Sequence, residues 1–459
     1  MVQNERSTAA HARGGCLRVR NRTIQYLVSA AAACLLAAPA ATAQDHDHGG
    51  ATEPQPAEHQ HVMPAAPSGA WTWSTDANVF FGYNYQQRKF ADFSAIESQN
   101  WFMVAGERRV GAGTLTLDGM FSLEPWTIGR LVYGNGHGIF DAQRVYAFTA
   151  TGERAPVGGS PQAFQTGESY LGSPLINYQH PHDLFMGLGA TYRFGAGAAK
   201  YALAADLVGA PALGPTSFMH RNSARDNPSV PLTHHYMDST HITTGVLTAG
   251  VEVGHVTLQT SRFRGEEPDE NRLDIDQPRL DSWSVRGTWR SGPWSAQVSG
   301  GHLDKPEWFE PVDVVRITAS AGFDGAIGSR PLAVTAAWGR NRDVGLFALD
   351  GYLVEWDLRM AAHDIVYGRA ESMLKEIFGL GVHPAGLLNH PRNFSHIDAL
   401  TVGYVRELPL AGWRRVGIGA DITVYRTSAD LVEYFGSPTS YHVFLRWRPN
   451  TPAAAHAHH

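Results

Sequence analysis

Apolar and polar side chains alternate in segments of about ten residues that recur from Ala77 to Trp447. A period of two is typical of a β-strand whose two faces meet different surroundings. In one such segment, residues 352–360, one face carries Tyr352, Val354, Trp356, Leu358 and Met360, and the other carries Glu355, Asp357 and Arg359. The pattern predicts an all-β chain.

Sixteen such segments are predicted, and their connections alternate between tight turns and longer loops. A soluble β-sandwich also shows alternating strands. An even number of strands with long loops at one end is typical of bacterial outer-membrane barrels, whose periplasmic turns are short and whose extracellular loops are long. Many of the tryptophans lie near strand ends, where rings favour the membrane interface. We therefore expect a transmembrane antiparallel β-barrel of about 16 strands.

The barrel segment, Ala77 to Trp447, resembles Gram-negative outer-membrane β-barrel proteins of the porin-like kind. Its end, "YHVFLRW", is similar to the aromatic-ended last strand that the barrel assembly machinery recognises, although the tail "RPNTPAAAHAHH" departs from that pattern. The segments "QHPHDLFM", "FMHRNSARDNP", "DSTH" and "YGRAE" resemble outer-membrane proteins of metal-handling neighbourhoods. The resemblance implies an outer-membrane location, contacts with membrane lipid and lipopolysaccharide, and a candidate homo-oligomer.

The amino-terminal residues 1–43 have the features of an export signal, with arginines before an apolar stretch and an Ala41-Thr42-Ala43 end. A lipid-anchored start at Cys34 is the alternative. We expect residues 44–76 to form a disordered His-rich periplasmic segment, 77–447 the barrel and 448–459 a His-rich tail. Without residues 1–43 the formal charge is −10, from 32 basic and 42 acidic side chains, which disfavours nucleic acid as a partner.

Histidines and acids gather in the long loops expected on one rim. Neutral imidazole beside carboxylates suits copper, zinc or nickel, and Met219 or Met237 would favour copper(I). The candidate rim ligands are His180, His182, Asp183, His220, His234, His235, Asp238 and His241. The alternative is that these imidazoles hydrogen-bond loop carbonyls and pack a loop against the lumen wall.

The flexible amino-terminal tract adds the candidate metal ligands His46, His48, His59 and His61. His383, His390 and His396 mark the seventh long loop. An acidic loop, "GEEPDENRLDIDQPRLD", would raise the local concentration of cations at the entrance. No cofactor is expected to be required.

The inner face of the strands is predicted to carry charged, pore-lining residues. They are Arg286, Arg316, Glu355, Asp357, Arg359, Arg369, Glu371, Arg415, Asp421 and Arg446. Mixed charge in a lumen indicates either a wet passage or a plugging network of ion pairs, and a passage is favoured.

Three functions follow from these patterns. The leading hypothesis is an outer-membrane porin-like channel whose His-rich loops and tails handle transition-metal cations in homeostasis or resistance. The second is an outer-membrane hydrolase, with Ser239 beside Asp238 and near His235 and His241, although Ser239 lacks a Gly-x-Ser-x-Gly context. The third is a structural or adhesive barrel.

Overall fold

The computed structural model describes residues 69–87, 89, 92–128, 132–134, 146–148, 154–156, 159–165, 168–170, 173–175, 177–269, 271–307, 311–376, 394–410 and 414–449. The predicted signal, most of the His-rich segment 44–76 and nearly all of the tail 448–459 lie outside these residues.

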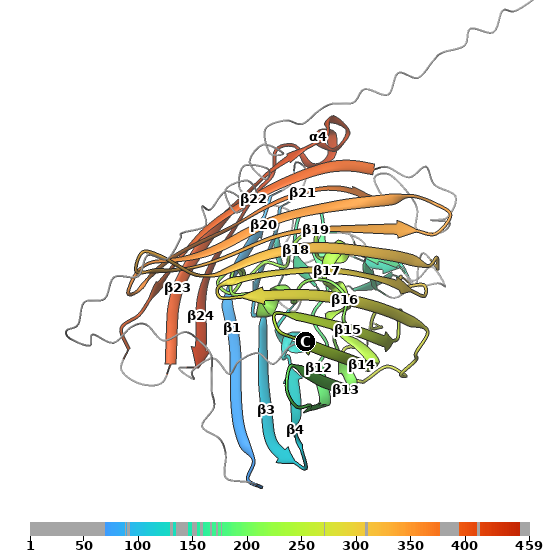
Figure 1. Cartoon of the computed structure of the whole chain (residues 1–459). Coiled ribbons are helices and arrows are strands. Elements are labelled where there is room, and N and C mark those ends of the chain that lie inside the picture. Colours follow the sequence, from blue (N-terminus) through green and yellow to red (C-terminus); the bar gives the residue numbers. More distant parts are fainter. Residues whose placement is uncertain are drawn as a thin grey trace, which may run out of the picture. The chain divides into compact units, whose positions relative to one another are not determined.

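Sixteen antiparallel strands form a closed ring, which confirms the predicted all-β barrel (Figure 1). Each strand pairs with its neighbour in the ring, and β24 closes the ring on β1, with Val79 opposite Trp447. The ring strands are β1 (Thr72–Gln86), β3 (Asn100–Val110), β4 (Gly113–Phe121), β12 (Phe185–Phe194), β13 (Ala199–Gly209), β14 (Thr243–Val253), β15 (Val256–Phe263), β16 (Ser282–Ser291), β17 (Trp294–Leu303), β18 (Val314–Ile327), β19 (Arg330–Asp343), β20 (Ala348–Ala361), β21 (Asp364–Glu376), β22 (Phe394–Glu407), β23 (Arg414–Thr427) and β24 (Thr439–Pro449). Strand pairing thus extends the ring slightly beyond the predicted bounds Ala77 and Trp447.

The remaining elements lie in the connections. The short strands are β2 (Phe93–Glu97), β5 (Val132–Gly134), β6 (Tyr146–Phe148), β7 (Arg154–Pro156), β8 (Ser160–Pro161), β9 (Glu168–Tyr170), β10 (Ser173–Leu175) and β11 (Tyr178–Gln179). The helices are α2 (Glu124–Thr127), α3 (His234–Met237) and α4 (Ala429–Phe435), with 3₁₀ turns η1 (Phe218–His220) and η2 (Ser239–His241). No helix among the described residues is long and apolar enough to cross a membrane.

The connections alternate in length around the ring, as predicted. Tight turns such as 111–112, 254–255, 292–293 and 328–329 join strands at one end, and the longer loops join them at the other. Glycines with positive φ occupy these turns, including Gly111, Gly254 and Gly292, because a residue without Cβ adopts that conformation without steric cost. We number the long loops in chain order: the second loop is 122–184, the third loop 210–242, the fourth loop 264–281 and the fifth loop 304–313.

The two faces of the wall differ as the alternation predicts. On β24, Tyr441, Val443 and Leu445 are exposed on the outside, whereas His442 and Arg446 are buried inside. On β20, Tyr352 and Met360 are exposed and Glu355 is fully buried. A soluble protein seldom exposes so continuous an apolar surface. Apolar side chains outside and polar side chains inside are the arrangement of a barrel that stands in a lipid bilayer.

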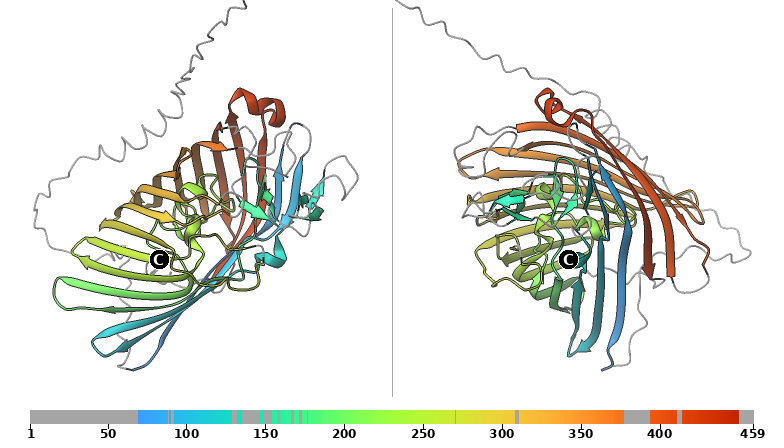
Figure 2. Two further views of the ribbon diagram at one scale, coloured as in Figure 1. Left: turned by 90° about the vertical axis from the view of Figure 1, so that its right-hand side faces the viewer. Right: turned by 180° about the vertical axis from the view of Figure 1, so that it is seen from behind.

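The third loop lies inside the ring of strands (Figure 2). Within it, α3 packs against β18, β19 and β20. Leu232, Tyr236 and Met237 of this loop belong to a buried apolar cluster with Leu353 of β20 and Met373 of β21. The lumen therefore contains a packed core that the loop shares with one side of the wall.

Candidate functional site

Small residues on the wall allow the third loop to approach closely. A Cβ atom at Gly339 of β19 would overlap the carbonyl oxygen of Tyr236, and one at Gly351 of β20 would press on the Tyr236 ring. The hydroxyl of Tyr236 donates to the carbonyl of Leu374, 2.9 Å away. The backbone of α3 can therefore lie directly on the inner surface of β19 and β20.

Glu355 of β20 anchors the third loop through two arginines. Its Oε1 accepts from Nε of Arg221 in the loop at 2.5 Å, and its Oε2 accepts from Nε of Arg369 on β21 at 3.0 Å. Arg369 also donates to the carbonyl of Ser229 in the loop at 2.7 Å. All three charged side chains are almost completely buried. Because each charge is paired in a dry site, losing one partner would leave the others uncompensated.

Asp226 of the third loop makes a second anchor. Its carboxylate accepts from Arg446 and, at 3.2 Å, from Arg448, both on β24. Arg446 also pairs with Glu407 of β22 at 2.6 Å. Together the two anchors tie one loop to strands β20, β21 and β24. At its other end the N–H groups of Ala212 and Gly214 donate to the hydroxyls of Ser261 on β15 and Ser299 on β17, both at 2.8 Å. The loop therefore contacts the inner wall from β15 to β24.

The inner wall holds all ten charged residues that were predicted to line the pore, and at least six of them bond to the third loop. Arg316 donates to the carbonyl of His235 at 2.7 Å, and Glu371 accepts from Thr233 at 2.9 Å; Glu355, Arg369 and Arg446 form the anchors. Arg286 donates to the carbonyl of Gly214 in the third loop at 3.3 Å, and Asp357 is buried beside Asp226 of the same loop. The other three lie elsewhere on the wall: Arg359 pairs with Glu407, Asp421 accepts from Tyr367 and His442, and Arg415 is on β23. Their role as pore lining stays a prediction.

The carboxylate of Asp238 organises the histidines of the third loop. It accepts from Nη1 of Arg221 at 2.7 Å, from Nδ1 of His234 at 2.8 Å and from the backbone N–H of Phe218 at 2.8 Å. Burial alone would raise the pKa of this carboxyl, but Arg221 and His234 hold the pKa well below its usual range. Asp238 is therefore charged wherever the barrel is folded near neutral pH.

Three of the candidate metal ligands, His182, His234 and His241, have rings that pack against the ring of Phe218. The ring of His241 lies between the other two. We call these three side chains the histidine row. The ring centroids of His182 and His241 are 5.5 Å apart, and those of His234 and His241 are 5.0 Å apart. Each Nδ1 donates to an acceptor at 2.8–2.9 Å: Glu124 for His182, the Asp238 carboxylate for His234 and the Asp238 carbonyl for His241. These bonds fix the rings within the packed loops.

The protonation of two of these rings is set by their surroundings. Burial, with the neighbouring His234 and His182, holds the pKa of His241 well below its usual value, so this ring is neutral. Burial also opposes charge on His182, but the Glu124 carboxylate outweighs burial and raises the pKa of His182. In this row, His182 is therefore paired with a carboxylate that favours its charged form, whereas His241 is neutral.

The remaining candidate ligands lie apart from this row or outside the described residues. His180 and His182 line a small cavity of about 50 Å³ with Met219. The ring of His220 packs on Trp101 with centroids 5.0 Å apart, and Asp183 pairs with Arg272 of the fourth loop at 3.1 Å. His46, His48, His59, His61, His383 and His390 lie outside the described residues, and His396 is on β22.

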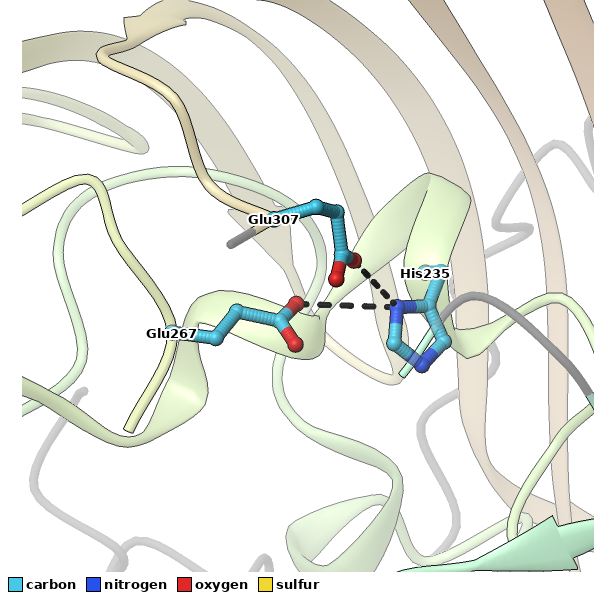
Figure 3. A group of neighbouring side chains, drawn as sticks. All are labelled: His235, Glu267 and Glu307. Carbon is cyan, nitrogen blue, oxygen red and sulfur yellow. Dashed lines mark ion pairs between the residues drawn. The ribbon is translucent and has the colours of Figure 1, made fainter. Parts of the chain in front are cut away.

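His235 is brought together with two carboxylates from other loops (Figure 3). Its Nδ1 lies 3.5 Å from Oε1 of Glu267 in the fourth loop and 3.7 Å from Oε1 of Glu307 in the fifth loop. Within the described part of the chain, this is the one group of three or more His, Cys, Asp or Glu side chains whose ligand atoms all lie within 4.8 Å of one another. His235 is buried, and both glutamates are partly buried.

Sequence reasoning found only part of this group. His235 was a predicted ligand, and Glu267 was placed in the acidic fourth loop as part of a negative entrance rather than as a ligand. Glu307 was missed, because a single glutamate in a short loop carries no local signal. The sequence does indicate that these two glutamates are near each other. The fourth loop precedes β16 and the fifth loop follows β17, so in a barrel the two loops lie side by side at the rim.

No protein-family model matches the chain, and no curated protein matches its sequence. Among solved structures, the chain is similar to an anion-selective porin from Comamonas acidovorans, at 10% identity over 83% of this chain and 100% of that one, with a TM-score of 0.46. It is also similar to a loop L8 deletion mutant of the outer-membrane protein OmpT of Vibrio cholerae, at 10% identity over 83% and 99%, with a TM-score of 0.45. A third is the outer-membrane channel DcaP of Acinetobacter baumannii, at 9% identity over 82% and 97%, with a TM-score of 0.44.

The strand pairing and the two faces of the wall show which kind of barrel this is. Its strand pairing closes the ring, its outer face exposes apolar side chains, and buried charged side chains such as Glu355, Arg369 and Arg446 lie on its inner face. The chain is a closed 16-stranded β-barrel of the outer-membrane type.

Proposed function

We propose that the protein is an outer-membrane channel whose mouth binds a divalent transition-metal cation between His235, Glu267 and Glu307. The convergence of these three side chains from three separate loops carries the metal part of the proposal. A charged cavity of about 470 Å³ inside the barrel supports the channel part.

The separations within the cluster fit ligands of one ion better than hydrogen bonds. At 3.5 and 3.7 Å the imidazole nitrogen is beyond ordinary hydrogen-bond distance from the two carboxylate oxygens. Two ligands of a tetrahedral zinc ion, each about 2.1 Å from the metal, lie roughly 3.4 Å apart. A small inward movement of the glutamates would therefore place all three donors on one ion, with water completing the coordination.

The chemistry of the donors selects the metal. One imidazole and two carboxylates suit a divalent ion such as zinc, whereas copper(I) prefers sulfur. Met237 is buried in the apolar cluster of the third loop, and Met219 packs near Phe218 and Val230. Both methionines are thus engaged in packing, and zinc is the ion that we propose.

Zinc titration of the full chain in detergent micelles tests the proposal. Glu267→Gln removes one ligand and should abolish one zinc site or weaken it by about 10-fold or more. Glu266→Gln is the matched control, because Glu266 pairs with Arg264 and Arg279 instead. The His-rich tails contribute equally to both variants, so identical isotherms for the two would refute the site.

As for the hydrolase alternative, among the described residues no hydrogen bond joins Ser239 to a histidine that could act as its base. The hydroxyl of Ser239 bonds to Nη1 of Arg316 at 3.0 Å, and the neighbouring His241 donates to the backbone carbonyl of Asp238. A serine nucleophile needs a base within hydrogen-bond reach. An esterase assay of the purified barrel, with Ser239→Ala as control, would revive the alternative if it showed activity that the variant loses.

We also propose that the apolar outer face contacts membrane lipid and that the loop end contacts lipopolysaccharide. Insertion by the barrel assembly machinery and homo-oligomerisation remain predictions for this chain.

A further inference from the structure

A cavity of about 470 Å³ lies between the third loop and the end of the barrel that carries the short turns. Its sides are formed by residues of strands in the arc from β3 to β18, and Ala210, Ala212, Gly214 and Thr216 of the third loop border it. It reaches the turn at Gly195–Gly197. The rim cluster of His235, Glu267 and Glu307 is not part of its lining.

The charge of the lining is unbalanced. Five basic side chains line the cavity, namely Arg109, Arg193, Lys200, Arg286 and Arg290, against two acidic ones, Asp206 and Glu252. Glu252 pairs with Lys200 at 3.2 Å. Five basic side chains against two acidic ones leave the lining with a net positive charge, so the cavity has a positive potential that attracts anions.

Arg286 is the buried member of this group, and its hydrogen-bond partners are neutral. Nε and Nη2 both donate to Oε1 of Gln259, at 3.2 and 3.0 Å, and Nη1 donates to the carbonyl of Gly214 at 3.3 Å. A buried guanidinium is normally paired with a carboxylate, because an uncompensated charge in a dry site is costly. Within the described residues, no carboxylate makes an ion pair with Arg286.

A second arginine on the same strand adds to this charge. Residues 286, 288 and 290 share the inward face of β16, because side chains alternate along a strand. Arg286, Thr288 and Arg290 all line the cavity. Two guanidinium groups and a hydroxyl on one face offer the planar and bidentate donors that bind oxoanions.

We propose that this cavity binds a small oxoanion at Arg286 and Arg290, and that it makes the inner half of the passage selective for anions. The anion supplies the negative charge that Arg286 lacks among its protein partners. The ligand class is a phosphate or carboxylate group, free or carried by a small solute. The inference does not depend on the metal site at the rim.

Titration of the full chain with inorganic phosphate in detergent micelles tests the binding step. EDTA is present so that no metal at the rim or the tails can hold phosphate. The native protein should bind phosphate, and Arg286→Gln should weaken binding by about 10-fold or more. Arg340→Gln, which removes an arginine paired with Asp350 on the outer face, should leave the affinity unchanged. Absence of binding, or equal affinity in Arg286→Gln, would overturn the proposal.

Two further measurements keep the test decisive. If Arg286→Gln does not fold, as judged by the mobility of unheated protein on a denaturing gel, Arg290→Gln takes its place. The reversal potential in a potassium chloride gradient should show preference for chloride in the native channel, and Arg286→Gln should lower the chloride-to-potassium permeability ratio by about twofold or more. Preference for potassium in the native channel would count against an anion-selective passage.

Discussion

Arg221 and Glu355 are 134 residues apart in the sequence, yet Nε of the arginine lies 2.5 Å from Oε1 of the glutamate inside the barrel. Both side chains are almost fully buried. The pair joins the middle of the third loop to β20, and Arg369 shares the same carboxylate. The third loop, which contains only α3 and two 3₁₀ turns, is thereby held against the inner wall.

Removing this carboxylate should destabilise the barrel strongly. Glu355→Gln leaves Arg221 and Arg369 buried without their shared counter-charge, which costs about 3–5 kcal/mol. Urea unfolding of the refolded barrel in detergent measures the change. The control is Glu252→Gln, which breaks the exposed pair with Lys200 and should change stability little, because water screens that pair. Equal stabilities of the two variants would show that the anchor contributes nothing.

Two arginine substitutions at similar depth, one on each face of the wall, test which side chains face lipid and which face the lumen. Val298 of β17 is 63% exposed on the outer face, whereas Ser320 of β18 lines the cavity. Val298→Arg should destabilise the barrel folded in lipid vesicles, lowering its free energy of unfolding by about 2–4 kcal/mol if it lies near the bilayer centre. Ser320→Arg should cost much less because it faces water, and the reverse order would mean that the faces are misassigned.

The ion pair between His182 and Glu124 should make stability depend on pH. Because Glu124 raises the pKa of His182 in the folded state, the pair contributes fully below the unfolded pKa of about 6.5. Its contribution is lost as the pH rises through the folded pKa. Unfolding of the native barrel and of His182→Gln, both in EDTA, should therefore differ most at pH 5.5 and least at pH 9. The difference reports the charge of His182 with all of its charged neighbours, Glu124, Asp183 and Arg272. A constant difference would exclude the ionic contribution.

The strands were predictable because each carries its own signal. Alternation along residues 352–360 fixes both the strand and the face of Glu355, and the same holds for His442 and Arg446 near the carboxyl end. The tight turns follow from glycines such as Gly111 and Gly292, which adopt positive φ. These features are local, so sequence periodicity is enough to find them.

The position of the third loop and the rim cluster could not be predicted in the same way. Neither Arg221 nor Asp226 lies in a periodic segment, and their partners Glu355 and Arg446 are far away in sequence. The sequence indicated metal ligands by residue type alone, and it grouped His182, His234 and His241 with His235. In the structure the first three are bonded to Glu124 and Asp238, and His235 instead faces Glu267 and Glu307. Which of these possible ligand side chains lie close together depends on how the long loops fold, and the local sequence does not determine that.

Single-channel conductance in a planar bilayer tests most directly the central claim, that this barrel is a channel narrowed by its third loop. The native protein is compared with a variant in which residues 217–240 are replaced by a short Gly-Ser linker, with folding of both verified by gel mobility. We predict that the native protein conducts and that the shortened variant conducts several-fold more, because the loop and its anchors no longer cross the lumen. A native barrel that passes no current, or a shortened variant whose conductance equals that of the native protein, would contradict the account.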